Sequence, residues 1–204
     1  MSFQLSTYLK EGTKSTHDQA ETSQFQRRLA NAEISRTDYA DYMGQLYLIH
    51  RALEHGLASN AATKDVANQQ EFQADYLARD LKVLGQEPDK VKPRNATKEM
   101  LARIESESKS NPLALLGYHY VLLGSKHGGK FIAAKVREKF EFDGEGCLYF
   151  DPYGTNFMPI WLKFKSNLDT AAQDETGGAI VLNAAKDMFE YFAKLGSELD
   201  AAAN

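Results

Sequence analysis

The chain of 204 residues contains 43% hydrophobic and 25% charged residues, a balance that suits a globular protein with a buried core. Its formal net charge of -4 argues against nucleic acid as the main partner, because a phosphate-binding surface needs a basic excess. Cys147 is the only cysteine, so no disulfide can form within the chain and a reducing compartment is expected. The sequence shows no signal peptide and no apolar run of about 18 residues, which predicts a cytoplasmic protein without a membrane anchor.

A polar stripe runs along the first predicted helix. Its members recur at helical spacing, so they lie within about 60° of one another around the helix axis. They are Lys10, Lys14, His17 and Glu21. Apolar residues at adjoining positions, such as Leu5 and Leu9, would pack the helix and leave the stripe facing a cleft. The same spacing also occurs on solvated faces, where ion pairs contribute only ~0.2–0.5 kcal/mol each, so periodicity alone favours a surface role.

The rest of the chain predicts further amphipathic helices. Ser35 followed by Asp38 is typical of a helix start, and Gly85 with Pro88 beyond it is typical of a helix end. The expected helices cover about 35–57, 72–84, 95–104, 112–140 with interruptions, 157–168 and, after the glycines at 177–178, 180–199. The glycine-rich residues 141–154 are expected to form a loop that can hold short extended pieces. No strand alternation is visible, which predicts one all-α domain of seven or eight helices over residues 1–204, with a short disordered C-terminal tail.

Three glycines interrupt an otherwise strong helical pattern between residues 118 and 135, YHYVLLGSKHGGKFIAAK. They are Gly124, Gly128 and Gly129. Relative to alanine, each glycine costs a helix about 0.8–1 kcal/mol, so the three together cost about 2.5–3 kcal/mol. Gly124 and Gly128 share one face, where a missing Cβ lets the backbone approach a flat ligand and bend over it. The alternative is a plain turn at His127-Gly128-Gly129 between two helices.

Two motifs carry a resemblance to a known family. The stretch LKEGTKSTHDQAE at residues 9–21 resembles the proximal helix of heme oxygenases, and LLGSKHGG at residues 122–129 resembles their glycine-rich distal helix. The similarity extends to LYLIHRALEHG, to GEG-L-F in the glycine-rich loop and to AKDMFEYFAKLGSEL, and so covers most of residues 5–199. The resemblance implies an all-α multi-helix bundle that holds heme between the proximal and distal helices.

The resemblance also implies an activity and the residues that bind the substrate. Heme would be cleaved by dioxygen to biliverdin, carbon monoxide and ferrous iron, with electrons from a ferredoxin or a flavoprotein reductase. His17 would be the axial ligand of the heme iron, and Glu21 would accept a hydrogen bond from its second ring nitrogen. The residues implied to lie at the heme propionates are Lys10, Lys14, Lys165 and His119.

On the distal side, the resemblance implies that Gly124, Ser125 and Gly128 are the catalytic residues and that Gly129 also lies against the heme. Backbone groups and ordered water around the glycines would supply protons to the bound oxygen.

The sequence departs from the mammalian-type pattern at several distal positions. Ser125 stands where those enzymes have an aspartate, Val121 replaces an arginine, and Trp161 replaces a lysine near the propionates. These changes affect the expected proton route and the seating of the heme rather than heme binding itself. His127 lies about 60° from Gly124 around the helix, and it is either a hydrogen-bonded histidine near the bend or a transient ligand at the sixth position of the iron.

Two other functions stay open at this point. A heme-binding or trafficking protein on the same fold would use His17 without turning heme over. A small-molecule enzyme of the wider helical superfamily would leave that histidine without iron. His50, Glu54 and His55 are spaced one residue too far apart for a metalloprotease motif, so we expect no dedicated metal site there. Cys147 has no base nearby in the sequence, which argues against a nucleophilic role.

Overall fold

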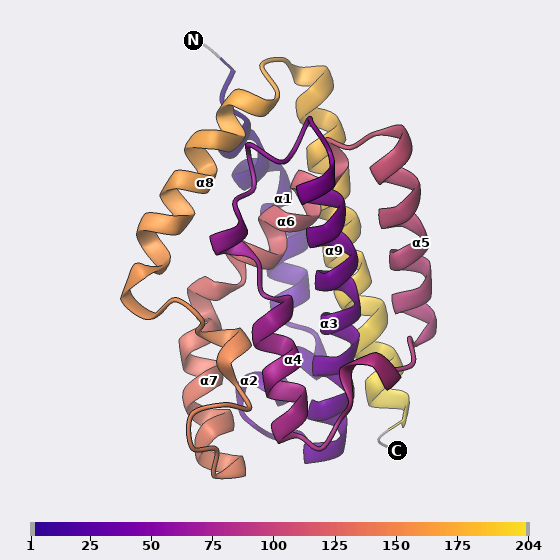
Figure 1. Cartoon of the computed structure of the whole chain (residues 1–204), viewed down its shortest axis with the longest axis vertical. Helices are drawn as coiled ribbons and strands as arrows, with labels where there is room; N and C mark the ends of the chain where they lie inside the picture. The colour runs from indigo at the N-terminus through magenta and orange to yellow at the C-terminus, as the bar shows by residue number, and fades with distance from the viewer. Residues whose placement is uncertain (1–2, 203–204) are drawn as a thin grey trace.

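The computed structural model describes residues 3–202, which form helices joined by loops (Figure 1). The α-helices of this part of the chain are α1 (Leu5–Glu21), α2 (Gln24–Ala30), α3 (Arg36–Ser59), α4 (Ala74–Val83), α5 (Asn95–Ser110), α6 (Ala114–Gly124), α7 (Lys126–Phe140), α8 (Phe157–Ala171) and α9 (Glu175–Ala202). Short 3-10 helices lie in the connections and are η1 (Gln69–Glu71), η2 (Pro88–Lys90), η3 (Leu148–Phe150) and η4 (Gly154–Asn156). No β-strand occurs between residues 3 and 202, and the all-α prediction is confirmed.

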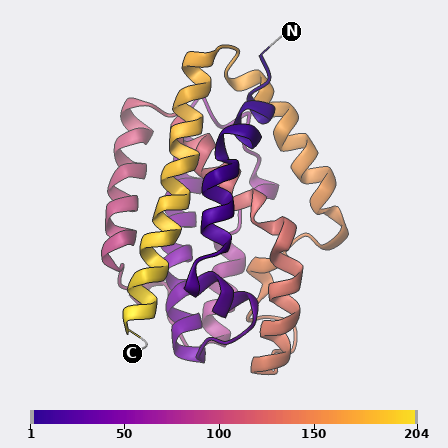
Figure 2. The same cartoon turned by 180° about the vertical axis from the view of Figure 1, so that it is seen from behind.

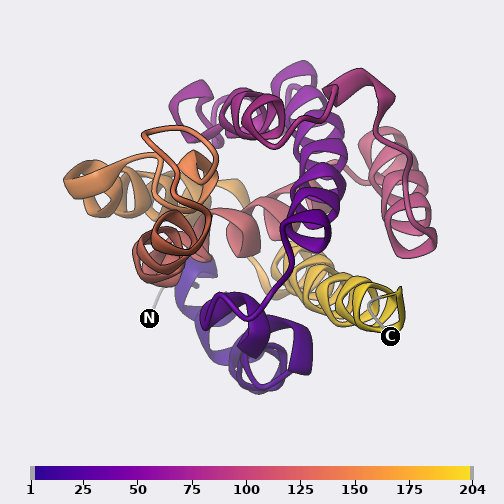
Figure 3. The same cartoon turned by 90° about the horizontal axis from the view of Figure 1, so that it is seen from below.

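Two helices organise the core. Almost every residue of α6 is buried, as expected for a helix that is apolar on all sides, and Figure 3 shows it near the middle of the molecule with other helices around it. The long helix α9 packs against α6 and also against α1, α2 and α5, and Figure 2 shows it running beside α1. Leu5 and Leu9 of α1 and Leu195 of α9 are fully buried, and each such side chain contributes about 1.5–3 kcal/mol by leaving water.

The chain bends where α6 meets α7. Only Ser125 separates the two helices, with φ of -59° and ψ of -17°, and its backbone N–H still donates to the carbonyl of Val121 at 3.0 Å. Helical hydrogen bonding therefore reaches the junction while the helix axis changes direction (Figure 1). Gly128 and Gly129 lie inside α7, so the alternative of a turn at residues 127–129 is wrong.

Some elements differ from the sequence-based expectations. The helix α2 was not expected, because it is short and buries only Phe25 and Leu29, too few apolar positions to show a period. The loop at 141–154 contains 3-10 turns instead of extended pieces. Gly177 and Gly178 lie within α9, where a Cβ on Gly178 would meet the ring of Phe3. The expected disordered tail is helical as far as Ala202, and the last two residues lie outside the described part of the chain.

Among residues 3–202, no helix combines the length and the apolar character needed to cross a bilayer.

Candidate functional site

The polar stripe predicted on the first helix lies on an exposed face of α1. Lys10 and Lys14 are exposed, and the side chain of His17 is 52% exposed, whereas Leu5 and Leu9 on another face are fully buried. The helix is thus held by its apolar face and presents its polar stripe outward. The imidazole is therefore accessible from outside the core.

The His17 side chain lies beside residues of α9 and of its own helix. Its ring is edge-on to Phe189 of α9, with 5.9 Å between the ring centroids, and its Nδ1 lies 3.7 Å from Oδ1 of Asp18. Glu21 is the last residue of α1, and its side chain lies outside the described part of the structure, so its predicted hydrogen bond to His17 stays a prediction. Phe189 was not predicted as a site residue, although it falls within the AKDMFEYF segment that supports the family resemblance.

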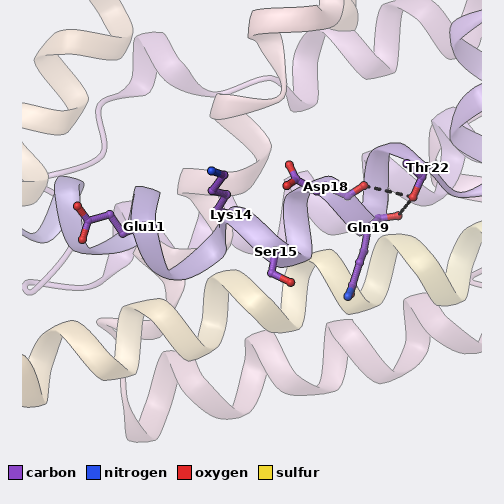
Figure 4. A pocket seen from close by; sticks show the side chains of 6 residues that line it. All are labelled: Glu11, Lys14, Ser15, Asp18, Gln19 and Thr22. Atoms are coloured by element: carbon purple, nitrogen blue, oxygen red, sulfur yellow. Dashed lines mark hydrogen bonds between the residues drawn. The ribbon is translucent and has the colours of Figure 1, made fainter.

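A shallow hollow of about 550 Å³ lies along α1 (Figure 4). It is lined by Glu11, Lys14, Ser15, Asp18, Gln19 and Thr22. Lys14 is the only lining residue that belongs to the polar stripe. The other lining residues lie further around the helix from His17, so we do not assign the hollow to the predicted heme site.

The three glycines near the bend have different surroundings. A Cβ on Gly129 would overlap the carbonyl oxygen of Phe150, so packing against η3 by itself requires glycine there. A Cβ on Gly124 would make an ordinary contact of 3.5 Å with the indole of Trp161. Around Gly128, which is exposed, a Cβ would meet no described atom within 4 Å. Packing within the protein therefore explains Gly129 but does not explain Gly124 or Gly128.

His127 is held close to the bend. Its Nδ1 lies 2.8 Å from the carbonyl oxygen of Gly124, an acceptor, so Nδ1 donates this hydrogen bond. Its ring is edge-on to the rings of Phe157 and Trp161 on α8, with centroid distances of 4.7 and 5.2 Å. These contacts match the simpler of the two interpretations, a hydrogen-bonded histidine beside the bend.

His119 occupies a different environment from the one implied by the resemblance. It is only 2% exposed, its Nε2 lies 3.0 Å from Oε2 of the fully buried Glu71, and Phe72 and Phe164 face its ring edge-on. A side chain enclosed in this way does not fit a partner for a solvent-facing propionate, and we withdraw that assignment. The sequence did not reveal this because the pairing joins α6 to a residue 48 positions away.

Lys165 lies on α8 beside the bend. Its Nζ is 5.8 Å from the centroid of the Trp161 ring, and a Cβ on Gly124 would lie 3.5 Å from the same indole. Its predicted pairing with a heme propionate stays a prediction.

Beneath the bend lies a buried polar cluster that the sequence did not predict. Asp80 of α4 accepts the backbone N–H groups of Gly146, Leu148 and Tyr149 at 2.7, 3.0 and 2.9 Å. Burial raises the pKa of this carboxyl, and the three hydrogen bonds oppose the rise. Lys126, the first residue of α7, is buried with its Nζ 3.1 Å from the centroid of the Tyr149 ring. This amine has no hydrogen-bond partner among residues 3–202, and burial lowers its pKa well below the usual value.

The elements that carry His17 and the glycines are connected through their neighbours. Helix α1 packs on α2 and α8, and these helices in turn contact α7 and α6. These contacts link α1 to α6 and α7 through shared neighbours. The structure thus defines an all-α protein with an exposed imidazole on one helix and a glycine-bearing bend between two others.

Comparison with known proteins places this fold and site in a family. The family model for heme oxygenase matches residues 3–198, and the chain belongs to the heme oxygenase family. The heme oxygenase of Guillardia theta is 29% identical over 179 residues, which cover 83% of this chain and 75% of that protein. Heme oxygenase 1 of Gallus gallus is 25% identical over 199 residues, which cover 93% of this chain and 67% of that protein.

Solved structures show the same fold at low sequence identity. The heme oxygenase from Leptospira interrogans superimposes with a TM-score of 0.87 at 24% identity, covering 96% of this chain and all of that one (100%). Heme oxygenase-2 from Synechocystis sp. PCC 6803, solved in complex with heme and NO, gives a TM-score of 0.90 at 22% identity, covering 98% of this chain and 86% of that one. The predicted heme oxygenase fold is therefore confirmed.

Proposed function

We propose that this chain cleaves heme to biliverdin, carbon monoxide and ferrous iron, using dioxygen and electrons from a separate ferredoxin or flavoprotein reductase. Membership of the heme oxygenase family supports the reaction, and relatives such as the Synechocystis enzyme bind heme. Heme is the substrate, and its iron supplies the site at which dioxygen reacts.

The observation that carries this proposal is the surroundings of Gly128. A mid-helix glycine costs about 0.8–1 kcal/mol relative to alanine, yet a methyl group there would touch no described atom. The fold gains nothing from this glycine, whereas a flat ligand lying against α7 requires the clearance. Gly124, which packing also leaves unexplained, lies four residues earlier, at the end of α6 and across the bend from Gly128.

The remaining residues of the site fit a heme molecule. His17 presents an exposed imidazole from a helix whose other face is buried, which suits an axial iron ligand. Lys10, Lys14 and Lys165 supply cations for the two propionate carboxylates. Ser125 lies at the bend and offers a hydroxyl to bound oxygen, where it acts as a hydrogen-bond donor or acceptor.

The proposal is tested by adding heme to the protein and then supplying a reductant and dioxygen in the presence of catalase. Loss of the Soret band with growth of biliverdin absorbance is the expected result. Catalase removes free peroxide, which bleaches heme without an enzyme. A protein that binds heme and keeps its Soret band would instead be a heme-binding or trafficking protein on this fold.

Replacement of the proposed ligand tests the site directly. In His17→Ala, we expect the protein-derived axial bond to be lost and added imidazole to restore the ligand-field spectrum. Because His17 is half exposed, the unfolding free energy should change by less than about 0.5 kcal/mol. An unchanged heme spectrum in the variant would show that another residue binds the iron.

A further inference from the structure

A chain of polar side chains runs from the α6–α7 bend into the interior. Tyr149 and His50 are both 2% exposed, and the Tyr149 hydroxyl lies 3.4 Å from Nε2 of His50. On the other side of the imidazole, Nδ1 lies 2.9 Å from Oε1 of Glu54, one turn along α3. At its outer end, Tyr149 lies near Ser125, the exposed residue that separates α6 from α7, and interaction with the Ser125 side chain opposes the rise that burial causes in the pKa of Tyr149. The chain therefore connects the proposed oxygen-binding side to a buried histidine.

Glu54 determines which nitrogen of His50 carries a hydrogen. Its Oε1 accepts the backbone N–H of Gln73 at 2.6 Å, and the N–H of Ala74 lies 3.2 Å from both carboxylate oxygens. An ionised carboxylate can only accept hydrogen bonds, so Nδ1 of His50 is the donor to it. In the neutral imidazole, Nε2 is then left as an acceptor for the Tyr149 hydroxyl.

The chain has two hydrogen-bonding arrangements that differ by one proton. When His50 is neutral, the Tyr149 hydroxyl donates inward to Nε2. When His50 is protonated, Nε2–H donates to the Tyr149 oxygen, and the Tyr149 hydroxyl donates outward to Oγ of Ser125. In both arrangements, each group keeps a partner, so neither leaves a buried polar group unpaired.

We propose that His50, Tyr149 and Ser125 form a side-chain proton path, which stores one proton on His50 and releases it to oxygen being reduced at the α6–α7 bend. The inference rests on the proposed heme oxygenase activity. In the transfer, the Nε2–H proton moves to the Tyr149 oxygen and the Tyr149 proton moves to Oγ of Ser125. The Ser125 proton leaves its hydrogen bond to the carbonyl of Leu122 and moves to the reduced oxygen. Three bonds to hydrogen break, three form, and the imidazolium becomes a neutral imidazole.

The surroundings of Ser125 determine when the path works. Ser125 is exposed, and its hydroxyl donates to the carbonyl of Leu122 at 2.7 Å. Water reloads His50 by the reverse transfer while the bend is uncovered. Heme lying against the glycines would cover the bend, and the stored proton would then be delivered without bulk water entering the site.

The groups around His50 favour release of its proton. Burial lowers its pKa, Lys126 and His119 add to the lowering, and the hydrogen bond and charge of Glu54 oppose it. A histidine with a lowered pKa gives up its proton more easily than an exposed one. The protonated fraction of His50 increases as the pH falls through its pKa. A turnover rate that depends on this proton therefore rises toward acid pH.

The hydrogen-bonding part of the proposal is tested on the protein without heme. Nitrogen-15 NMR of the histidine ring is expected to show the Nδ1–H form of neutral His50 in the wild type. In Tyr149→Phe, the Nδ1–H form should remain, while the Nε2 resonance shifts to the position of a nitrogen without a hydrogen bond. An Nε2–H form in the wild type, or an Nε2 resonance that does not move in Tyr149→Phe, would overturn the path.

The delivery role is tested by turnover of the heme complex. We expect Tyr149→Phe to bind heme with an unchanged ferric spectrum, to degrade it at least about 10-fold more slowly, and to lose the rise in rate toward acid pH. Tyr191→Phe is the matched control, because Tyr191 is also buried and its hydroxyl faces Thr97 at 3.4 Å, away from the bend. Turnover of Tyr149→Phe at the wild-type rate and with the wild-type pH profile would overturn the delivery role and leave the proposed function standing. Failure of the wild type to degrade heme would overturn the proposed function itself.

Discussion

The stripe on α1 and the bend between α6 and α7 are built in opposite ways. The stripe consists of residues from one helix whose positions follow from local spacing alone, and Lys10, Lys14 and His17 are exposed. The polar cluster below the bend joins α3, α4, α7 and η3, and its members His50, Asp80, Lys126 and Tyr149 are buried. Substitutions in the stripe should therefore change ligand binding with little effect on folding. Substitutions at the bend should change stability and chemistry together.

The largest stability effect is expected for Asp80→Ala. This substitution leaves three buried backbone N–H groups of the η3 segment without their acceptor, and each unpaired group costs about 1–3 kcal/mol. We expect the unfolding free energy to fall by about 3–5 kcal/mol, measured by urea denaturation. Asp80→Asn, which keeps an acceptor oxygen, should lose less. A loss of under about 1 kcal/mol in Asp80→Ala would show that the cluster is not a structural centre.

The second largest loss of stability is expected for Gly129→Ala. The new methyl group would overlap the carbonyl oxygen of Phe150, and this backbone atom can move only if η3 moves with it. Overpacking of this kind typically costs about 1–3 kcal/mol, and the rigid neighbour places this variant at the upper end of that range. Thermal and urea unfolding measure the loss. Wild-type stability in this variant would mean that η3 adjusts freely.

Lys126→Met should stabilise the protein. It replaces a buried amine that lacks a hydrogen-bond partner among the described residues, and we expect a gain of about 1–3 kcal/mol near pH 7. The lowered pKa of Lys126 means that the unfolded chain binds its proton more readily, so wild-type stability rises with pH toward the ordinary lysine value of 10.5.

The difference in unfolding free energy between Lys126→Met and the wild type should therefore decrease between about pH 7 and about pH 10. Urea unfolding of both proteins across this range measures this difference. A difference that stays constant with pH would contradict a lowered pKa for Lys126.

Among the substitutions near the bend, Gly128→Ala is expected to have the smallest effect on stability, and this effect has the opposite sign to that of Gly129→Ala. The new methyl group meets no described atom, and the helix gains about 0.5–1 kcal/mol. Heme affinity and the rate of biliverdin formation should fall, because the methyl group occupies the clearance over α7. Gly129→Ala is the natural comparison, since it changes the same helix one residue further on. If Gly128→Ala were more stable and equally active, the argument that Gly128 leaves room for heme would be wrong.

The sequence predicted the helix that carries the polar stripe but not the buried polar residues. Lys10, Lys14 and His17 could be placed because a helical period fixes where neighbouring side chains point. Glu71, Asp80 and Lys126 carry no such signal, because charged residues are normally exposed and their burial depends on contacts between distant segments. His50 and Glu54 were considered only as metal ligands, although their spacing of four residues already allowed a hydrogen bond within one helix.

Glycine was equally ambiguous in the sequence. The glycines at 177–178 suggested the start of a helix, yet they lie inside α9, where Gly178 makes room for the ring of Phe3. The adjacent Gly128 and Gly129 are alike in the sequence and differ completely in their surroundings. A glycine marks a close approach, and only the tertiary structure shows whether the approaching group belongs to the protein or to a ligand.

The place of α9 in the chain affects how the protein folds during synthesis. Four helices made earlier, α1, α2, α5 and α6, pack on α9, and Arg28 of α2 bonds Asp200 of α9 across 172 positions. Their apolar faces stay uncovered on the ribosome until α9 has emerged, and contacts over such distances form slowly. The nascent chain should therefore bind chaperones that hold unfolded segments, and a pause in translation just before α9 should increase aggregation.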